Sequence, residues 1–427
     1  MQQLVMNKVD RLKGAVTVPG DKSISHRAVM FAALSEGKSA IFNFLESEDC
    51  QNTKKAFQQL GIKFSTRGKA LIVYGQGLYG LRASEKPIDC GNSGTTMRLL
   101  SGILAGQEFT SVVTGDKYLR RRPMKRVITP LRIMGAKIEA VRDELAPLKI
   151  YGGDLQGIDY NLPVASAQVK SCVLLAGLYA DGKTSVVEPV PTRDHTERML
   201  GYLGAKISKK GLTTSVQGNT RLKGNTIIVP GDISSAAFLL VAASIVPGSK
   251  VVIRKVGINP TRNGIISVLK KMGAKITIRN KRTFGAEPVA DLEVRASNLH
   301  GITIAGKIIP NIIDEIPVLA VAAAMARGKT IIRGAKELRV KETDRIKSMA
   351  SQLKKMGANI SERKDGLVIQ GPAKLKGAVV DSFGDHRTAM SLAVAALAAE
   401  GKTVIKDTAC INTSFPGFTK ILGKISQ

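Results

Sequence analysis

The chain has 427 residues, of which 44% are hydrophobic and 23% charged, a composition that excludes a disordered or collagen-like protein. Lys and Arg outnumber Asp and Glu by 64 to 34, giving a formal net charge of +30. This balance favours anionic partners, either nucleic acid or small anionic substrates. Because the chain has no Trp and only 18 other aromatic residues, 7 Tyr and 11 Phe, base-stacking surfaces would be hard to build. Small anions are therefore at least as good an interpretation.

The cysteines indicate neither a zinc site nor a disulfide framework. Cys50, Cys90, Cys172 and Cys410 are far apart and form no Cys-x-x-Cys pair, and the chain has only four His. We expect no metal and a reducing compartment. The N-terminal residues lack the apolar core of a signal peptide, and the longest uncharged stretch is interrupted by Pro and Gly. These features predict a cytoplasmic protein with no membrane partner.

Two sequence elements recur along the whole chain. The first is an amphipathic helix that ends at a Gly and leads into an apolar strand. Its copies lie at Gly61, Gly135, Gly204, Gly273 and Gly357, with a degenerate sixth copy at Leu422-Gly423-Lys424-Ile425. The second is an Ala-rich helix that runs into a Gly turn and a β-branched strand, at Gly37, Gly106, Gly182, Gly248, Gly328 and Gly401. A Gly in left-handed backbone is the usual end of such an amphipathic helix.

The repeats predict the fold class and the domain organisation. Each unit has the order strand, buried helix, strand, surface helix, strand, strand, which indicates an α/β (α+β) protein with three units in each of two domains. Val16–Asp21 and Ile227–Asp232 are matching segments that mark the two junctions. We therefore expect one domain of residues 1–18 and 231–427 and another of residues 19–230, joined by two crossings of the chain.

Polar or cap-rich loops precede the Ala-rich helices, and three of them contain residues that suggest function. Helix N-termini carry unpaired NH groups and partial positive charge, so several of them facing one space would bind anions. Ordinary capping explains the loop at 230–235, which has no basic residue. Capping explains less well the loops that have Lys22, Arg27, Arg98, Lys170 or Arg387 within or just after them, because a cation opposes the helix dipole unless an anion is present. We therefore favour a functional role for the loops that carry Lys22, Gln168 and Arg387.

Two acidic groups allow more than one interpretation. Asp314 and Glu315 lie in an otherwise apolar stretch, where carboxylates are costly to bury unless they are paired. A helix cap would explain one of them and leave the other unexplained. The charged run at 338–347 contains Lys341, Glu342 and Arg345, and such a run is often only a solvated helix face.

Eight motifs together resemble the EPSP synthase (3-phosphoshikimate 1-carboxyvinyltransferase) family. In chain order they are PGDKSISHR, GNSGTTMR, RRPMKR, SAQVK, RDHTERML, NPTR, RVKETDR and GDHR. Several of them are similar to the second class of that family, and the resemblance spans residues 19–418. It implies a two-domain inverted α/β barrel built from six βαβαββ repeats, three in each domain.

The resemblance also implies a reaction and its residues. The family transfers the enolpyruvyl group of phosphoenolpyruvate to the 5-hydroxyl of shikimate 3-phosphate, in aromatic amino-acid biosynthesis, with no metal or organic cofactor. The residues expected around phosphoenolpyruvate are Lys22, Gly94, Arg122, Gln168, Arg345, His386 and Arg387. Those expected around shikimate 3-phosphate are Lys22, Ser23, Arg27, Ser166, Ala167, Gln168, Arg193, Asp314 and Lys341. Asp314 and Glu342 would be the acid–base pair, with Lys22 as a further candidate base.

Two alternatives remain at this point. The related UDP-N-acetylglucosamine enolpyruvyl transferases share the six-unit fold but carry a reactive Cys at the position of Lys117. A nucleic-acid-binding protein is favoured only by the net charge. The chain also departs from some EPSP synthases by having Thr413 in place of a Lys near its C-terminus. We expect a monomer that binds small anionic substrates and no specific nucleic acid.

Overall fold

The computed structural model describes residues 2–427, and these form two compact units. The terminal unit comprises the chain up to Pro19, Pro230–Thr283 and Pro288–Gln427. The inserted unit comprises Gly20–Val229 together with Phe284–Glu287. Apart from the four residues Phe284–Glu287, the boundaries of the units fall at Pro19/Gly20 and Val229/Pro230. The expected domains, residues 1–18 with 231–427 and residues 19–230, stay a prediction.

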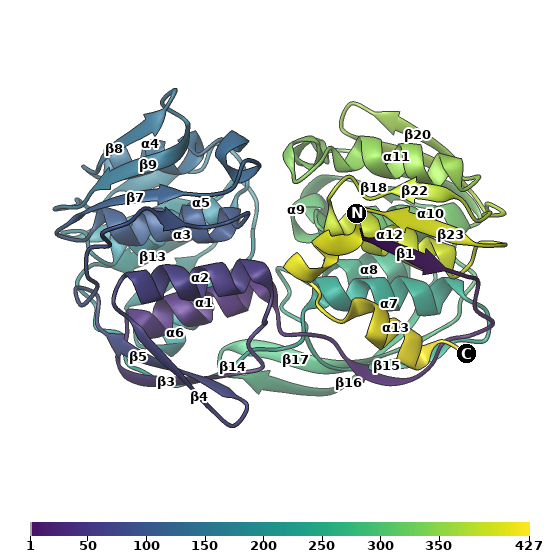
Figure 1. Cartoon of the computed structure of the whole chain (residues 1–427), viewed down its shortest axis with the longest axis horizontal. Helices are drawn as coiled ribbons and strands as arrows, with labels where there is room; N and C mark the ends of the chain where they lie inside the picture. The colour runs from purple at the N-terminus through teal and green to yellow at the C-terminus, as the bar shows by residue number, and fades with distance from the viewer. Residues whose placement is uncertain (1) are drawn as a thin grey trace. The chain divides into compact units, whose positions relative to one another are not determined.

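Three four-stranded sheets enclose the inserted unit (Figure 1). Their strand orders are β14 (Thr226–Ile228), β3 (Glu36–Phe42), β5 (Ala70–Gln76), β4 (Lys63–Arg67); β6 (Ile88–Asp89), β7 (Thr110–Thr114), β9 (Leu145–Tyr151), β8 (Lys137–Val141); and β10 (Asp159–Asn161), β11 (Lys183–Val187), β13 (Thr213–Gln217), β12 (Ile207–Lys210). In each sheet the first two strands are parallel and the other pairs are antiparallel. The three sheets are therefore copies of one topology.

The helices of the inserted unit fall into two classes. The inner helices α1 (Lys22–Ala33), α3 (Gly94–Ala105) and α5 (Ala167–Gly177) are buried along almost their whole length and pack on one another. The outer helices α2 (Glu48–Gln59), α4 (Lys125–Ile133) and α6 (His195–Tyr202) bury one face each, and a short 3-10 helix, η1, spans Leu119–Arg121. This division follows from sequence, because the inner helices are rich in Ala and aliphatic residues whereas the outer ones are amphipathic.

The terminal unit repeats the same plan with three sheets (Figure 1). Their orders are β16 (Lys275–Phe284), β17 (Glu287–Arg295), β15 (Lys250–Gly257), β2 (Lys13–Thr17); β18 (Thr303–Ile304), β19 (Gly328–Ile332), β21 (Gly366–Gly371), β20 (Asn359–Arg363); and the three-stranded β1 (Gln3–Met6), β23 (Thr403–Lys406), β22 (Val379–Asp381). The inner helices are α7 (Ile233–Ile245), α10 (Ile316–Met325) and α12 (His386–Ala396). The remaining helices are α8 (Gly264–Lys271), α9 (Ile309–Ile312), α11 (Arg345–Lys355), α13 (Phe418–Ile425), η2 (Gly306–Ile308), η3 (Lys336–Val340) and η4 (Thr408–Thr413).

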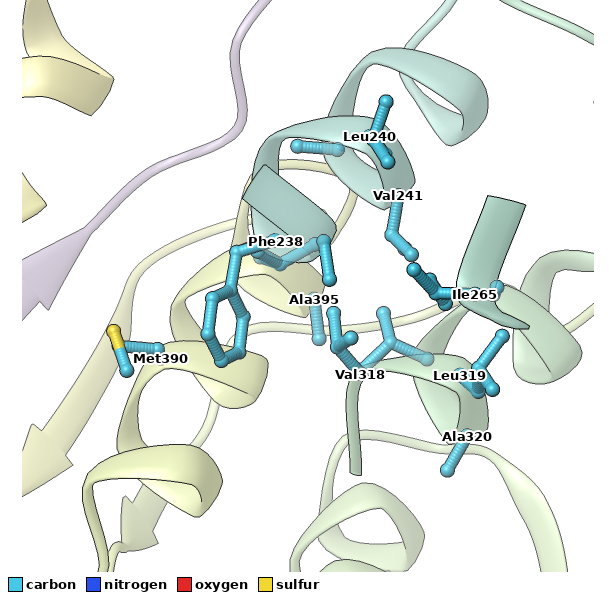
Figure 2. Close-up of a cluster of buried hydrophobic side chains, with 14 of the residues drawn as sticks. Phe238, Leu240, Val241, Ile265, Val318, Leu319, Ala320, Met390 and Ala395 are labelled. Carbon is cyan, nitrogen blue, oxygen red and sulfur yellow. The ribbon is translucent and has the colours of Figure 1, made fainter. Parts of the chain in front are cut away.

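Aliphatic contacts among the three inner helices form the core of the terminal unit. Figure 2 shows Phe238 and Val241 of α7, Val318 of α10 and Ala395 of α12 pointing toward one another. All four are at most 2% exposed. Helices inside and sheets outside, three repeats in each unit, are the arrangement of a two-domain inverted α/β barrel, so the predicted fold class is confirmed.

The glycine signal is confirmed at five of its six positions. Gly61, Gly135, Gly204, Gly273 and Gly357 end outer helices with φ between +90° and +102°, where a side chain would be strained. The sixth copy was predicted wrongly, because Gly423 lies inside α13. There Phe418 packs edge-on against Phe238 and Phe415, and the N-terminal strand β1 pairs with β23. The last repeat is thus completed by the opposite end of the chain.

At each junction, the last strand before the junction pairs within the unit that the chain is leaving. β2 leads into α1 of the inserted unit but pairs with β15 of the terminal unit. β14 leads into α7 of the terminal unit but pairs with β3 of the inserted unit. The turn into α1 requires Gly20, because a Cβ there would lie 2.0 Å from the carbonyl oxygen of Asn43.

No single helix within residues 2–427 is both long and apolar enough to cross a membrane. The bent pair of helices Gly306–Ile312 and Ile316–Met325 is long and apolar enough only when its two arms are counted together. Nine of the ten residues of the second arm, α10, are buried in the core of the terminal unit.

Candidate active site

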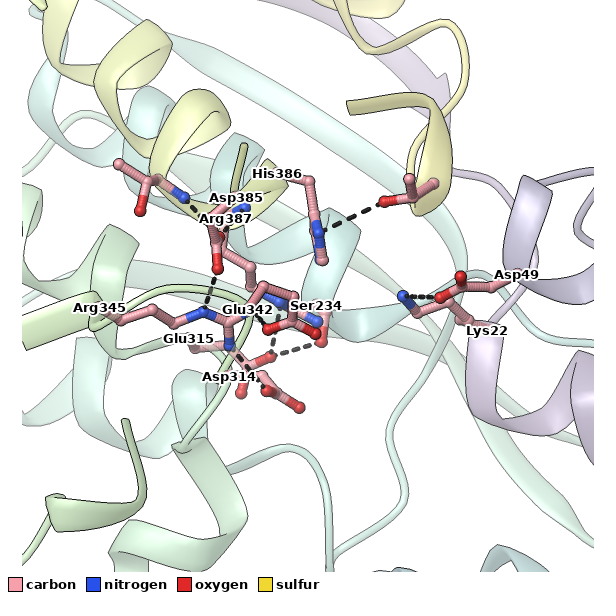
Figure 3. A network of polar contacts seen from close by, with 12 residues as sticks. Lys22, Asp49, Ser234, Asp314, Glu315, Glu342, Arg345, Asp385, His386 and Arg387 are labelled. Carbon is pink, nitrogen blue, oxygen red and sulfur yellow. Dashed lines mark hydrogen bonds and ion pairs between the residues drawn. The ribbon is translucent and has the colours of Figure 1, made fainter. Parts of the chain in front are cut away.

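The first inner helix begins with a partly buried cation beside a carboxylate. Asp21 caps α1 by accepting a hydrogen bond from the backbone N–H of Ile24 at 2.9 Å. The next residue, Lys22, forms an ion pair with Asp49 of α2, with 3.0 Å between Nζ and Oδ2 (Figure 3). Asp49 was not predicted from sequence, since nothing in its helix distinguishes it from an ordinary acidic residue of a first turn. The pair holds the Lys22 ammonium at the N-terminus of α1.

Arg27 is held in place mainly by hydroxyl groups. Its Nε donates to Oγ1 of Thr196 at 2.7 Å, its Nη2 to Oγ of Ser171 at 2.8 Å, and its Nη1 to the carbonyl of Ser23 at 2.9 Å. The side chain is 4% exposed, and burial lowers the pKa of Arg27 to about 10. The guanidinium is therefore still charged at neutral pH, and its direct partners are neutral. A buried cation of this kind favours an anionic ligand.

Two arginines meet at the start of α3. A Cβ added at Gly94 would lie 2.9 Å from Nη1 of Arg98 and 3.1 Å from Nη1 of Arg122. Arg98 Nη1 donates to Oε1 of Gln168 at 2.7 Å, which connects α3 to the first turn of α5. Three residues predicted from sequence, Gly94, Arg122 and Gln168, thus surround one helix N-terminus. Arg98 also lies there, although no role was assigned to it from the sequence. Its position directly after the loop that opens α3 was the one sequence feature that could have indicated it.

The other predicted residues of the inserted unit lie close to these. Ser166 caps α5 by accepting from the N–H of Val169 at 3.3 Å, and Ala167 is the first residue of that helix. Ser23 is in the first turn of α1. Arg193 precedes α6 and lies near enough to Arg27 for the two positive charges to interact. The first two turns of all three inner helices therefore carry candidate substrate-binding groups.

The terminal unit places three carboxylates around one arginine. Arg345 donates from Nε to Asp385 at 2.8 Å, from Nη1 to Asp314 at 3.3 Å and from Nη2 to Glu342 at 2.6 Å (Figure 3). Burial lowers the pKa of Arg345. The three carboxylates, Asp385 most strongly, raise the pKa by more than burial lowers it, so the net shift is upward. Asp314 and Glu342 keep 17% and 26% of their side-chain surface exposed, whereas Asp385 keeps none. The two proposed acid–base residues are thus the accessible members of this group.

Glu315 has a different environment from its neighbour Asp314. Its carboxylate accepts from Nη1 of Arg262 at 2.9 and 3.0 Å and from Oγ of Ser234 at 2.5 Å, and lies 3.5 Å from Nη1 of Arg387. The side chain is fully buried. The two adjacent acids therefore have different partners. Glu315 neutralises the buried Arg262 and Arg387, whereas the partly exposed Asp314 pairs with Arg345.

Lys341, His386 and Arg387 complete the predicted set. Lys341 follows η3 and directly precedes Glu342. His386 begins α12, and its Nδ1 lies 3.5 Å from Oγ1 of Thr413. Asp385 caps this helix by accepting from the N–H groups of Arg387 and Thr388 at 2.7 and 3.1 Å. A hydroxyl, and not a Lys ammonium, therefore faces His386 from the C-terminal segment.

No group of three or more His, Cys, Asp or Glu side chains that could hold a metal ion occurs within residues 2–427. The three buried cysteines all have pKa values raised by burial, which disfavours the thiolate that a nucleophile or metal ligand requires. The groups available for chemistry are therefore cations, helix N-termini and carboxylates. Such a set can bind multiply charged anions and transfer protons.

Comparison with known proteins decides the family. The sequence model of EPSP synthase (3-phosphoshikimate 1-carboxyvinyltransferase) matches residues 6–422. A 3-phosphoshikimate 1-carboxyvinyltransferase of Brevibacillus brevis is 55% identical over 425 residues, which cover 99% of this chain and 100% of that one. The chain belongs to the EPSP synthase family. The resemblance predicted from the eight motifs is thereby confirmed.

Solved structures agree with this assignment. An EPSP synthase from Acinetobacter baumannii superposes with a TM-score of 0.91 at 46% identity, covering 100% of this chain and 98% of the other. The enolpyruvyl transferase NikO from Streptomyces tendae superposes with a TM-score of 0.79 over 99% of this chain and 97% of that one. At 18% identity, the second likeness shows a shared fold alone.

Proposed function

We propose that the protein transfers the enolpyruvyl group of phosphoenolpyruvate to the 5-hydroxyl of shikimate 3-phosphate, releasing phosphate and 5-enolpyruvylshikimate 3-phosphate. The observation that carries this proposal is the match of residues 6–422 to the sequence model of the EPSP synthase family. The small anionic substrates follow from the family. The monomeric state and cytoplasmic location expected from the sequence stay predictions.

The cations of the inserted unit suit such substrates. Each substrate brings a phosphate and a carboxylate, so several positive groups are needed before the two can approach one another. We assign Ser23, Arg27, Ser166, Ala167, Gln168 and Arg193 to shikimate 3-phosphate, and Gly94, Arg122 and Gln168 to phosphoenolpyruvate, with Lys22 near both. The hydroxyl-held Arg27 and the paired arginines at Gly94 support these roles.

The terminal unit supplies the proton-transfer groups. Glu342 protonates C3 of the enol, and C2 becomes electrophilic as the positive charge develops. The 5-hydroxyl then attacks C2 while Asp314, or Lys22 as its neutral amine, accepts its proton. The Glu342 carboxylate then takes back a proton from C3 as phosphate leaves the tetrahedral intermediate, which gives the enol ether. Lys341 completes the contacts to shikimate 3-phosphate.

Arg345 has a defined part in this scheme. Arg345 pairs with Asp314 at 3.3 Å and with Glu342 at 2.6 Å. We propose that it binds phosphoenolpyruvate together with His386 and Arg387. A substrate carboxylate would compete with Glu342 for the guanidinium. Substrate binding would then free Glu342 to carry the proton that it delivers to C3.

The two alternatives have less support. A UDP-N-acetylglucosamine enolpyruvyl transferase would need a reactive Cys where this chain has Lys117. A nucleic-acid-binding protein has only the net charge in its favour, and the chain carries few aromatic residues for stacking.

The test is phosphate release from phosphoenolpyruvate by the purified protein, measured with each acceptor in turn. We expect release that depends on shikimate 3-phosphate and none with UDP-N-acetylglucosamine. Release with the latter acceptor alone would reject the proposal. A binding assay with RNA over a salt series serves as the third arm, since nonspecific phosphate contact weakens steeply with salt.

A further inference from the structure

A fully buried lysine lies behind the candidate substrate-binding residues of the inserted unit. Lys170, in α5, is 0% exposed. Its Nζ lies 2.9 Å from Oε2 of Glu188 and 2.6 Å from Oε1 of Glu197. We call these three residues the Lys170 triad. A lysine is almost never fully buried without partners, and a buried ion group is weak evidence for a role in stability, because apolar residues of the same size often do as well. The triad therefore calls for another explanation.

The two carboxylates of the triad hold the segment that carries Arg193. Glu188 directly follows β11 and accepts from the backbone N–H of Thr192 at 3.0 Å and from its hydroxyl. This closes the loop of residues 188–192 just before Arg193. Glu197 lies in the first turn of α6, four residues after Arg193. Lys170 is thus tied to the chain on both sides of Arg193.

The same framework supports Arg27. The two hydroxyls that accept from Arg27 belong to Ser171 and Thr196, at 2.8 and 2.7 Å. Each is the immediate sequence neighbour of a triad member, Lys170 and Glu197. The hydroxyls also lie 2.7 Å from each other. A shift of α6 relative to α5 would therefore displace a partner of Arg27 and the loop of Arg193 together.

Charge strengthens this coupling. The triad has one cation and two carboxylates, so it carries an excess negative charge. The negative charge of Glu197 acts on Arg27 and opposes the loss of its proton caused by burial. Glu197 thus interacts with two cations, Lys170 by direct contact and Arg27 through its charge. Removing Lys170 would leave two buried carboxylates that repel each other, and this repulsion would displace Glu197.

We propose that Lys170 is a positioning residue that holds Arg27 and Arg193 in the geometry needed to bind the phosphate of shikimate 3-phosphate. This inference rests on the proposed function. Lys170 does not touch the substrate, because no part of it is exposed; it acts through Glu188 and Glu197. Two guanidinium groups that are already in place bind a phosphate more tightly than groups that must first be ordered.

The test compares substitutions at Lys170 by calorimetric titration with shikimate 3-phosphate and by steady-state kinetics. Lys170→Met keeps the aliphatic stem and removes the charge. We expect the Kd for shikimate 3-phosphate to rise about 10- to 100-fold, the scale expected when a binding group is misplaced by about 1 Å. We expect kcat at saturating substrates to change by less than about threefold, because the reacting groups lie elsewhere. Lys170→Arg, which keeps the charge, should recover most of the affinity.

A second variant covers the case in which Lys170→Met does not fold. Lys170→Met/Glu197→Gln removes one buried carboxylate with the cation and so leaves the net charge of the triad unchanged. It should fold and still bind shikimate 3-phosphate weakly. The matched control is Val216→Ala, a fully buried change in β13 of the same repeat, which should lower the melting temperature without changing the Kd.

Each outcome decides one claim. A Kd within about twofold of the wild type in the double variant, or a fall in kcat at unchanged Kd, would overturn the positioning role. If the wild type itself neither binds nor turns over shikimate 3-phosphate, the proposed function fails instead. An equal rise of Kd in Val216→Ala would show that lost stability, not lost positioning, causes the effect.

Discussion

The candidate-site arginines of the two units differ in the groups to which they donate. In the inserted unit, Arg27 is fixed by two hydroxyls and a carbonyl, and Arg98 by an amide and a carbonyl. In the terminal unit, Arg345 is fixed by three carboxylates and Arg262 by a fourth. Neutral partners leave the positive charge available to a ligand, whereas carboxylate partners cancel it.

The difference suggests a division of tasks. The cluster in the terminal unit has three arginines, Arg262, Arg345 and Arg387, against four carboxylates, Asp314, Glu315, Glu342 and Asp385. Such a cluster places proton-transfer groups directly beside the arginines that we assign to phosphoenolpyruvate. In the inserted unit, Arg27 and Arg98 donate to hydroxyl, amide and carbonyl oxygens, an arrangement that suits anion binding. The following predictions test that contrast, from the largest expected effect to the smallest.

Removing a proton-transfer group should abolish turnover and spare the fold. We expect Glu342→Gln and Asp314→Asn each to lower kcat by about 100- to 10,000-fold, the range for a positioned acid or base. Both side chains are partly exposed, so neither change should lower the melting temperature strongly. Stopped assays of phosphate release measure the effect, and turnover like that of the wild type would remove that residue from the acid–base pair.

Removing the buried carboxylate beside Asp314 should instead lower stability. Glu315→Gln removes the carboxylate that pairs with the buried Arg262 and Arg387, and breaking such a buried ion pair should cost about 3 to 5 kcal/mol of unfolding free energy. Urea denaturation measures this. The control is Glu400→Gln, in an exposed pair with Lys8, which should leave the denaturation midpoint unchanged. A stable Glu315→Gln protein would show that the terminal unit does not depend on this carboxylate.

Replacing a hydroxyl-held arginine should weaken binding. Arg27→Lys keeps the charge but cannot donate simultaneously to Thr196, Ser171 and the carbonyl of Ser23. We expect the Kd for shikimate 3-phosphate to rise about 10- to 100-fold, on the order of one or two charged hydrogen bonds. Calorimetry tests this, with the exposed Arg221→Lys as control. An unchanged Kd would mean that Arg27 serves only the packing of α1.

A methyl group at the start of α3 should have a smaller effect on phosphoenolpyruvate. Gly94→Ala places Cβ within about 3 Å of the guanidinium groups of Arg98 and Arg122, and these flexible ends can move at moderate cost. We expect KM for phosphoenolpyruvate to rise about tenfold, equivalent to about 1.4 kcal/mol. Gly153→Ala is the control, since its Cβ would contact nothing. Equal KM values in the two variants would contradict the assignment of Gly94.

The smallest expected effect is the pH dependence of stability caused by His26. Burial, together with the charges of Lys22 and Arg27, lowers the pKa of His26 well below its usual 6.5. Above that usual value the residue is neutral in both folded and unfolded chains. As the pH falls below it, the unfolded chain binds a proton first, so stability is lost by at most about 1.4 kcal/mol per pH unit.

His26→Asn should therefore make the fall in unfolding free energy between pH 7 and 5.5 shallower. Asn can keep the contact to Thr53, which lies 2.6 Å from Nδ1 of His26. The exposed His300→Asn serves as control and should follow the wild type. The same slope in all three proteins would show that His26 does not control acid sensitivity.

The fold was predictable because its signals are local and repeated. The glycine ends of the outer helices at Gly61 or Gly273 act within a few residues, and five copies of the pattern reinforce one another. The prediction failed where a long-range contact overrode the local signal. Gly423 lies inside α13, where Phe418 packs on Phe238, 180 residues away in sequence.

The candidate site was predictable in its members but not in their partners. Motifs identified Lys22, Arg27, Asp314 and Arg345 because each lies in a distinctive run of residues. Their partners lie far along the chain: Thr196 is 169 residues from Arg27. No local pattern indicates such pairs, so the different surroundings of Asp314 and Glu315 emerged only from the structure.

The division of tasks between the units is tested most directly by one affinity. Shikimate 3-phosphate is titrated into Glu342→Gln and the Kd is compared with those of the wild type and Arg27→Lys. The account predicts a Kd within about threefold of the wild type for Glu342→Gln, because that residue acts on the transition state and not on the ground-state complex. A loss of affinity as large as that in Arg27→Lys would contradict it.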